Sequence, residues 1–173
     1  AADLGLDKLF VYRMDPAQSS LAANDPPYAQ VKAGSGPRHF AFDPSRNRAY
    51  AINEMASTVT TFDFNPARGA LTEIQTVSTL PTGFSGESTT AEIAIDSKGK
   101  FLYGSNRGHD SIAVFSIDAP TGKLTLLENA PTGGKVPRNF AIDPTGRYLF
   151  AANQKSDSIV IFRIDPNSGR LQA

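Results

Sequence analysis

Short apolar-rich runs alternate with polar turns along the chain, and two of these runs return at a regular spacing. The first reads HFAFD at 39–43, EIAID at 92–96 and NFAID at 139–143. The second reads LFVYRMDP at 9–16, VTTFDFNP at 59–66, IAVFSID at 112–118 and IVIFRIDP at 159–166. Counted from Asp15 to Asn65, Asp118 and Asp165, the steps are 50, 53 and 47 residues. A repeat of about 50 residues is typical of a β-propeller blade.

Each repeat reads as four short strands with no sustained helical periodicity. In the third repeat we expect strands at roughly 92–96, 101–105, 111–118 and 124–129. A β-sandwich has similar strand spacing but does not repeat two turn motifs at fixed offsets. The absence of tryptophan argues against a WD40 propeller. The sequence therefore predicts an all-β fold, a β-propeller of about three and a half four-stranded blades.

The turns between the strands repeat as well. Between the first and second strands stand Asp43-Pro44-Ser45-Arg46-Asn47, Asp96-Ser97-Lys98-Gly99 and Asp143-Pro144-Thr145-Gly146. Between the third and fourth strands the same proline and glycine chemistry returns at 65–69, 120–122 and 165–169. Proline presets φ for a type I turn and glycine takes the positive φ that follows, so we expect antiparallel hairpins.

The blade units are expected at about 1–33, 34–80, 91–130 and 137–173, and the two outermost are incomplete. The first lacks its two inner strands, because residues 3–8 align with the loop after the second strand. The last ends at Arg170-Leu171, where a fourth strand begins. Since stacked repeats need their neighbours for burial, we expect this chain to assemble with a missing propeller half or with a second copy of itself.

The composition excludes several classes of function. Hydrophobic residues make up 40% and charged residues 20%, and the formal net charge is zero. This balance gives no general attraction to nucleic acid or to an anionic membrane, and the longest apolar runs, such as 158–162, are far too short to span a bilayer. With no cysteine and only His39 and His109, thiolate chemistry and a three-histidine metal site are excluded, and we expect neither metal nor cofactor.

The repeat offsets show which residues share the mouth of the central channel. The starts of the first strands carry Pro37-Arg38-His39, Thr90-Ala91-Glu92 and Pro137-Arg138-Asn139. The ends of the second strands carry Asp3, Asn53, Asn106 and Asn153, followed by Leu4, Glu54, Arg107 and Gln154. Antiparallel hairpins bring these two sets to the same edge of each blade. The scaffold positions are nearly constant between repeats whereas these differ, which indicates a site for a specific ligand.

Each candidate also has a structural interpretation. Asn53, Asn106 and Asn153 suit bridging of loop backbone, as short polar side chains do. Arg38 and Arg138 suit either a salt bridge between blades or anion binding, and His39 either a packed or a reactive histidine. For Glu54 and Arg107 we favour function over an exposed loop charge.

Three stretches resemble blades of the propeller-type bacterial 6-phosphogluconolactonases. They are GSGPRHFAFDPSRNRAYAINEMASTVT at 34–60, AEIAIDSKGKFLYGSNRGHDSIAVFSID at 91–118 and PRNFAIDPTGRYLFAANQKSDSIVIFRID at 137–165. The chain is thus similar to the lactonases with a seven-bladed β-propeller, a family that also includes the fungal carboxymuconate lactonizing enzyme. The resemblance implies a seven-bladed ring, with the N-terminal blades outside this chain.

The resemblance also implies an active site. A histidine after Pro-Arg, a glutamate after the second-strand asparagine and arginines around the mouth fall on His39, Glu54 and Arg107, with Arg38 and Arg138 as further cations. His39 or Glu54 would act as general base toward water. Arg107 would stabilise the oxyanion, and Arg38 or Arg138 would hold a phosphate or carboxylate. Asn53, Asn106 and Gln154 complete the expected substrate-binding set.

The expected reaction is metal-independent hydrolysis of a small anionic sugar lactone, foremost 6-phosphogluconolactone to 6-phosphogluconate. The alternatives are a carboxymuconate-type cyclisation, a propeller that binds a ligand or protein without chemistry, and a split piece with no activity by itself. We expect a cytoplasmic location, with a periplasmic or secreted one as the alternative. The inserted segment 81–90, PTGFSGESTT, is expected on the same face as the site, either over the mouth or as a surface loop.

Overall fold

The structure is a computed structural model that describes residues 1–44 and 47–173. Its strands form four antiparallel sheets, each built from strands that follow one another in the chain. No helix occurs among the described residues. The expected all-β propeller is therefore confirmed. Ser45 and Arg46 of the turn expected at 43–47 lie outside the described residues.

The strands of the first two sheets are β1 (Ala2–Asp3), β2 (Lys8–Asp15) and β3 (Ser20–Gln30), then β4 (Pro37–Phe42), β5 (Arg48–Asn53), β6 (Thr58–Asn65) and β7 (Ala70–Ser78). Those of the last two are β8 (Thr89–Ile95), β9 (Phe101–Arg107), β10 (Ser111–Ile117) and β11 (Leu124–Pro131), then β12 (Pro137–Ile142), β13 (Tyr148–Asn153), β14 (Ser158–Ile164) and β15 (Leu171–Gln172). We call these sheets blades one to four.

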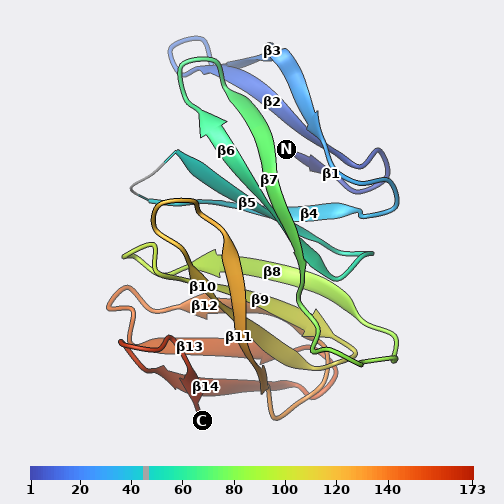
Figure 1. Cartoon of the computed structure of the whole chain (residues 1–173), viewed down its shortest axis with the longest axis vertical. Helices are drawn as coiled ribbons and strands as arrows, with labels where there is room; N and C mark the ends of the chain where they lie inside the picture. Colours follow the sequence, from blue (N-terminus) through green and yellow to red (C-terminus); the bar gives the residue numbers. More distant parts are fainter. Residues whose placement is uncertain (45–46) are drawn as a thin grey trace.

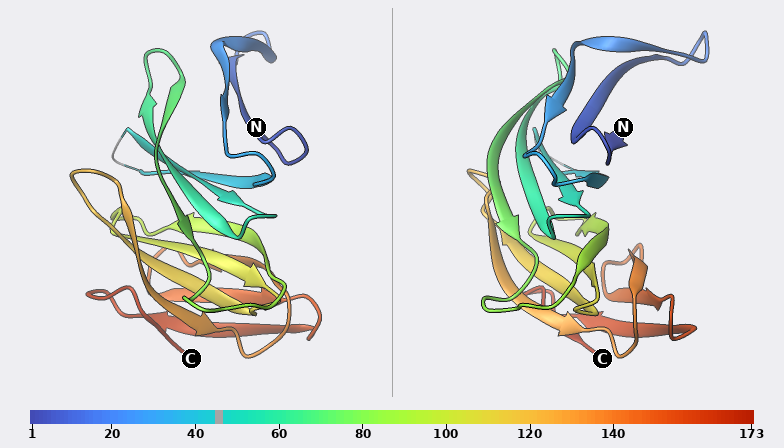
Figure 2. Two further views of the ribbon diagram at one scale, coloured as in Figure 1. Left: turned by 45° about the vertical axis from the view of Figure 1, so that its right-hand side comes forward. Right: turned by 90° about the vertical axis from the view of Figure 1, so that its right-hand side faces the viewer.

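The four blades are stacked along the longest axis in chain order, with β1–β3 at one end and β12–β14 at the other (Figure 1). Seen from the side, the stack curves, and the outer strands β7 and β11 follow its outer side (Figure 2). The inner strands β4, β8 and β12 contact one another across neighbouring blades. The molecule is thus an arc of a ring whose inner side is lined by the first strand of each complete blade.

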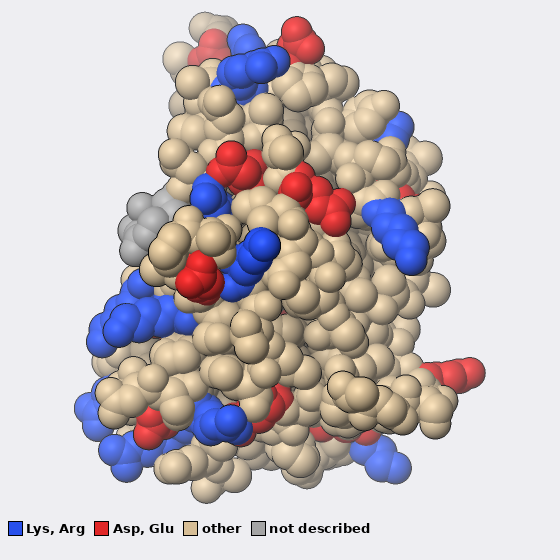
Figure 3. All heavy atoms as spheres, in the orientation of Figure 1, with Lys and Arg blue, Asp and Glu red and all other residues tan. Residues whose placement is uncertain are grey.

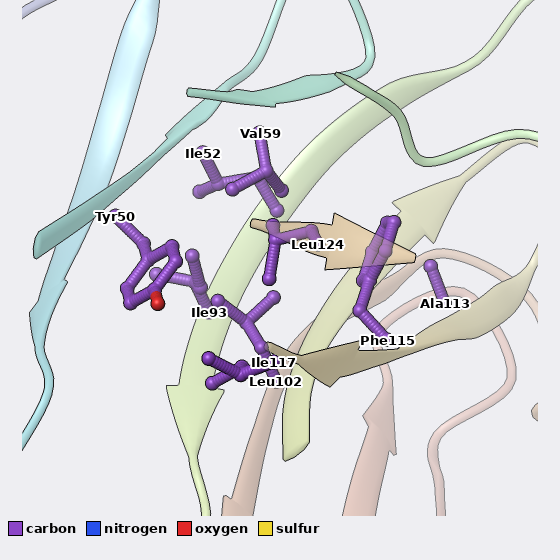
Figure 4. Packing of buried hydrophobic residues seen from close by; sticks show 9 residues of the cluster. All are labelled: Tyr50, Ile52, Val59, Ile93, Leu102, Ala113, Phe115, Ile117 and Leu124. Atoms are coloured by element: carbon purple, nitrogen blue, oxygen red, sulfur yellow. The ribbon is translucent and has the colours of Figure 1, made fainter. Parts of the chain in front are cut away.

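Apolar side chains fill the space between neighbouring blades. Between blades two and three, Tyr50, Ile52 and Val59 meet Leu102 and Phe115, and all five are buried (Figure 4). A second cluster joins blades three and four, and a third joins blades one and two. Since strand side chains alternate between the two faces of a sheet, a central blade needs apolar residues on both faces, which explains its nearly continuous apolar strands.

Two buried tyrosines also link the blades by hydrogen bonds. The Tyr50 hydroxyl donates to the carbonyl oxygen of Gly122 at 3.0 Å, and the Tyr103 hydroxyl donates to that of Gly169 at 2.9 Å. Both glycines have positive φ in the turn between the third and fourth strands of the next blade. Burial raises the pKa of Tyr50 to about 12 and that of Tyr103 further, and the negative charges of Asp43 and Asp96, respectively, add to the two shifts.

Aspartates in the turns between second and third strands anchor the chain as it enters the next blade. The Asp7 carboxylate accepts hydrogen bonds from the backbone of Gly36 at 2.7 Å and Gly34 at 2.8 Å, which lower its pKa. Asp110, in the equivalent turn of blade three, accepts a hydrogen bond from the backbone N–H of Val136 at 2.8 Å. These contacts hold the starts of the inner strands β4 and β12, and that is where candidate site residues begin.

The flank of blade four exposes Tyr148, Phe150, Ile159 and Ile161, with Ile159 67% exposed. Their counterparts in blade three, one 47-residue step earlier, are buried against blade four. This flank is therefore a surface of the kind that a further blade covers. On the face drawn in Figure 3, acidic and basic side chains are both present, in keeping with a net charge of zero.

Two strand boundaries differ from the sequence prediction. Strand β8 begins at Thr89, so the inserted loop ends at Ser88 and not at Thr90. Blade one keeps the last two residues of its second strand, because Ala2 and Asp3 pair with Leu9 and Lys8. Backbone pairing of two residues leaves no apolar pattern that a sequence would show.

Candidate active site at the inner rim of the blades

A β-bulge interrupts each inner strand at the candidate positions. In β4 the pairing passes from Pro37↔Asn53 to His39↔Ile52, so Arg38 is the extra residue. Strand β12 repeats this around Arg138, and β8 has its irregularity between Thr90 and Ile93. Side chains of successive strand residues normally point to opposite faces, but a bulge re-aims them. Arg38 and His39 therefore both line one hollow, as do Arg138 and Asn139.

Glu54 lies between two arginines from neighbouring blades. Its Oε2 atom is 2.8 Å from Nη1 of Arg38, and its Oε1 atom is 2.7 Å from Nη2 of Arg107. Arg38 also donates from Nε to the carbonyl oxygen of Ala91 at 3.2 Å, and Arg107 donates to that of Thr90 at 2.8 Å. The expected residues Arg38, Glu54 and Arg107 thus form one ion-paired cluster across blades two and three.

The two arginines keep Glu54 ionised. Its side chain is only 16% exposed, and this burial raises the pKa, but the hydrogen bonds and charges of Arg107 and Arg38 together bring the pKa below its ordinary value. Both carboxylate oxygens are engaged. The Nε atom of Arg107 is buried without a hydrogen-bond partner among the described residues. An unmet buried donor of this kind costs about 1–3 kcal/mol.

His39 is held by a glutamate that the sequence prediction left out of the site. Its Nδ1 atom lies 2.9 Å from Oε1 of Glu92, and the other carboxylate oxygen of Glu92 accepts a hydrogen bond from the amide of Asn139. His39, Glu92 and Asn139 occupy the same register position in β4, β8 and β12, at steps of 53 and 47 residues. That shared position was the available signal for Glu92, since equivalent positions on neighbouring inner strands lie side by side.

A hollow of about 400 Å³ opens beside these residues. It is lined by Arg38, His39, Arg138, Asn139 and Gln154, with the turn residue Asp157 at one side. The structure therefore brings together four of the expected site residues: Arg38, His39, Arg138 and Gln154. Glu54 and Arg107 do not line this hollow, and they are connected to it through Arg38.

Arg138 differs from Arg38 in having no ion pair with a carboxylate among the described residues. The residue that follows the second strand is Glu54 in blade two but Gln154 in blade four, exactly two repeat steps later. Both Arg138 and Gln154 are exposed, and the carboxylate-bearing residue Asp157 lines the same hollow without an ion pair to Arg138. Arg138 is thus a cation that faces the hollow with its guanidinium available.

The three second-strand asparagines are buried inside the blades. Asn53 donates to the hydroxyls of Thr58 and Thr60, each at 2.9 Å. Asn106 and Asn153 donate to the carbonyl oxygens of Thr79 and Thr132, at 2.9 and 3.1 Å. These bonds fit the structural interpretation of bridging between strands and loops.

The loop of residues 79–88 packs on the turn that follows Arg107. The Ser88 hydroxyl donates to the carbonyl oxygen of Arg107 at 3.2 Å, and the ring of Phe84 meets that of His109 edge to face, with centroids 4.9 Å apart. A Cβ atom on Gly108 would lie 2.3 Å from the carbonyl oxygen of Glu87. The close backbone approach explains why this position carries glycine.

A larger hollow of about 600 Å³ lies between blades one and two. It is lined mostly by apolar residues such as Leu9, Phe40, Phe42 and Leu71, at the place where the other blades have complete inner strands. Its lining includes the cations Arg13 and Arg68 but none of the site residues expected from the sequence, so we take the smaller hollow as the candidate site. Within residues 1–44 and 47–173, no group of three or more His, Asp or Glu side chains is placed to hold a metal ion, and no helix is suited to cross a membrane.

Antiparallel blades arranged in an arc, with a charged and asymmetric inner rim, define a β-propeller with a candidate ligand site. Comparison with known families then identifies which one. The family model "Lactonase, 7-bladed beta-propeller" matches residues 1–173, and the chain belongs to this family.

Individual relatives agree with the family assignment. The 6-phosphogluconolactonase of Bacillus subtilis is 38% identical over 139 residues, which are 80% of this chain and 39% of that protein. The periplasmic gluconolactonase of Pseudomonas aeruginosa is 38% identical with a TM-score of 0.93, over 100% of this chain and 48% of that one. A protein from Lactobacillus plantarum has 34% identity and a TM-score of 0.91, over 96% and 48% of the two chains. The chain thus spans about half the length of the relatives it matches.

Proposed function

We propose that this chain contributes the active site of a lactonase that hydrolyses a sugar lactone, with 6-phosphogluconolactone as the foremost substrate. The observation that carries the proposal is the hollow that His39 lines together with two arginines, Arg38 and Arg138. The names of the relatives from B. subtilis and P. aeruginosa support the same reaction class. A histidine and two cations in one hollow suit the attack of water on an anionic ester.

His39 is the general base in this proposal. Its side chain is 40% exposed, one ring nitrogen bonds to Glu92, and the other is available to a water in the hollow. Glu54 is less suited, because both of its oxygens accept bonds from arginines and its lowered pKa disfavours taking up a proton. Histidine is the side chain most often used as a general base near neutral pH.

A water attacks the carbonyl carbon of the lactone while Nε2 of His39 takes its proton. The negative charge then on the carbonyl oxygen is stabilised by Arg38, which lines the hollow next to His39. When the tetrahedral intermediate collapses, the bond to the ring oxygen breaks and that oxygen takes the proton from His39. The product is the hydroxy acid, ionised at neutral pH.

Arg107 supports Arg38 in this scheme. The sequence prediction gave Arg107 the oxyanion, but its side chain is 13% exposed and does not line the hollow, whereas Arg38 does. Through Glu54 it fixes the position of Arg38. Arg138 is the anion-binding group, since a guanidinium without a carboxylate partner matches a phosphate, and Gln154 adds an amide donor beside it.

Metal independence and a cytoplasmic location belong to this proposal as well. The gluconolactonase of P. aeruginosa is described as periplasmic, which keeps the alternative location open. A further part of the proposal is that the exposed flanks of blades one and four are covered by other blades of the ring, because their apolar residues correspond to buried ones in the central blades.

The proposal is tested by measuring hydrolysis of 6-phosphogluconolactone and of unphosphorylated gluconolactone, with the spontaneous rate subtracted, for the wild-type chain and for His39→Ala. We expect faster hydrolysis of the phosphorylated lactone and loss of the enzymatic rate in the variant. The matched control is His109→Ala, which removes the other histidine of the chain and leaves the hollow intact. Rates equal to background for both lactones would contradict lactone hydrolysis and favour a binding propeller.

A further inference from the structure

Three blades contribute one residue each to a chain of hydrogen bonds at the inner rim. His39 of β4 bonds through Nδ1 to Oε1 of Glu92 in β8, and Asn139 of β12 donates to Oε2 of the same carboxylate. The link from His39 to Glu92 measures 2.9 Å. Because the three residues lie on different blades, this chain of bonds exists only when the blades are stacked in the right register.

Glu92 is held firmly at this place. Its Oε1 atom also accepts a hydrogen bond from the backbone of Ile93 at 3.0 Å, and its own backbone N–H donates to the hydroxyl of Ser105 at 3.0 Å. The side chain is only 18% exposed. Both carboxylate oxygens therefore have partners, and the carboxylate has little freedom to turn away from the histidine.

We infer that Glu92 is a positioning residue that keeps the proton of neutral His39 on Nδ1. An ionised carboxylate only accepts hydrogen bonds, so the ring nitrogen that faces it must carry the hydrogen. In a neutral imidazole the other nitrogen is then the acceptor. Nε2 of His39 is thereby the basic atom on the side of the hollow, and it has no partner among the described residues.

Asn139 also helps to position His39, because it holds the carboxylate of Glu92. Its amide has donors to offer, and the bond to Oε2 keeps the other oxygen of Glu92 on His39. A carboxylate at position 139 would repel Glu92 and compete for the histidine. The amide in blade four thus orients the carboxylate in blade three, which in turn orients the base in blade two.

The catalytic meaning of this arrangement rests on the proposed function, but the tautomer itself does not. If the chain hydrolyses lactones with His39 as base, then loss of Glu92 leaves the substrate-binding arginines in place and removes the orientation of the base. The expected kinetic signature is a fall in kcat of about 10²–10⁴-fold, the range for a misplaced general base, with KM nearly unchanged.

The tautomer can be measured directly because the chain contains only two histidines. We would record two-bond ¹H–¹⁵N correlations of the uniformly labelled chain at pH 8, at which a neutral imidazole predominates for an ordinary histidine. His39 is expected as the Nδ1–H tautomer. In Glu92→Ala the Nδ1–H population should fall, and in Glu92→Gln, whose amide oxygen can still accept, it should be largely retained. His109, which bonds to the Ser111 hydroxyl at 2.7 Å, should not change and reports on folding.

The outcomes separate the two claims. An Nε2–H tautomer of His39 in the wild type, or an unchanged tautomer in Glu92→Ala while His109 stays native, would overturn the inference. If Glu92→Ala does not fold, Asn139→Ala applies the same criterion, with partial loss of the Nδ1–H form as the expected result and no change as the contrary one. If the tautomer is as expected but no lactone is hydrolysed, the positioning role stands and the proposed function fails. If His39→Ala abolishes hydrolysis but the tautomer of His39 does not change in Glu92→Ala, the proposed function stands and the positioning role of Glu92 fails.

Discussion

Nη2 of Arg107 lies 2.7 Å from Oε1 of Glu54, which ties the end of β9 in blade three to the end of β5 in blade two. The second oxygen of Glu54 bonds to Arg38 in the inner strand of its own blade. One carboxylate thus fixes two guanidinium groups at the rim. This ion pair has a mechanical role as well as an electrostatic one, since it joins two blades at the site.

The Glu54→Gln variant should lose stability and activity together. Removing the charge leaves two partly buried guanidinium groups without a counter-ion. Loss of one partner costs about 3–5 kcal/mol for a buried pair, and at this exposure we expect about 1–3 kcal/mol. Urea unfolding of Glu54→Gln beside Glu128→Gln measures it. Glu128 pairs with the half-exposed Arg170, so the control should lose less than about 1 kcal/mol. Equal losses in the two variants would show that the Glu54 cluster has no special weight.

The lowered pKa of Glu54 adds a pH dependence. A carboxylate whose folded-state pKa lies below its unfolded value stabilises the folded state above the unfolded pKa, and this contribution is lost as the pH falls through the folded value. The advantage of the wild type over Glu54→Gln should therefore shrink below about pH 4.5, the ordinary value for glutamate. Unfolding of both proteins at a series of pH values checks this, and an advantage that grows toward acid pH would refute it.

Arg138 should make the chain select phosphorylated over unphosphorylated lactones. In Arg138→Gln we expect the KM for the phosphorylated lactone to rise by about 10- to 100-fold, the value of one charge-assisted hydrogen bond of about 1.5–3 kcal/mol. The constants for unphosphorylated gluconolactone should change little. Arg147→Gln is the matched control, because Arg147 is an exposed cation at the turn between β12 and β13, away from the hollow. An equal effect of Arg138→Gln on both lactones would argue against an anion site there.

The tyrosine links between blades should contribute to stability in a pH-dependent way. Tyr103→Phe and Tyr50→Phe each leave a glycine carbonyl without its donor, at about 1 kcal/mol each. Burial raises the pKa of Tyr50 to about 12, so the unfolded chain ionises first, near pH 10, and wild-type stability should fall from pH 10 toward 12. Denaturation at pH 8 and pH 11 measures both effects. Tyr12→Phe, at an exposed tyrosine, should lose little stability at pH 8 and should keep the pH dependence of the wild type. A wild type equally stable at both pH values would contradict the prediction.

Gly108→Ala should displace the loop of residues 79–88. The new Cβ atom would meet the carbonyl oxygen of Glu87 at 2.3 Å, and φ is +105°. Gly34→Ala is the control for backbone conformation alone, because φ there is +78° and no atom lies within 4 Å of the added Cβ. The left-handed conformation costs about 1–2 kcal/mol in either variant. Thermal unfolding should show a clearly larger loss for Gly108→Ala, and an equal loss would mean that the loop yields freely.

The fold could be predicted from the sequence because its signals are local and repeated. Proline and glycine return in each turn at fixed offsets, and Gly99, Gly122 and Gly169 indeed take positive φ. The same offsets placed His39, Glu54 and Arg107 at one rim. What the sequence does not show is the β-bulge at Arg38, which turns two successive side chains into one hollow.

The hydrogen-bond partners that join neighbouring blades could not be predicted from the sequence either. Glu92 stood at the position equivalent to His39, but which of its neighbours it would bond depends on how the inner strands lie against one another. The available guanidinium of Arg138 follows from Gln154 standing where blade two has Glu54. The difference between Gln154 and Glu54 becomes informative only because the structure shows that Glu54 forms an ion pair with Arg38.

A titration of the ¹⁵N-labelled chain with 6-phosphogluconate, the product of the proposed hydrolysis, tests whether the hollow beside His39 binds the anionic ligand. We predict saturable chemical-shift changes at Arg38, His39, Arg138 and Gln154, and their loss in Arg138→Gln. Changes centred on the hollow between blades one and two, or no changes at millimolar ligand, would contradict the account.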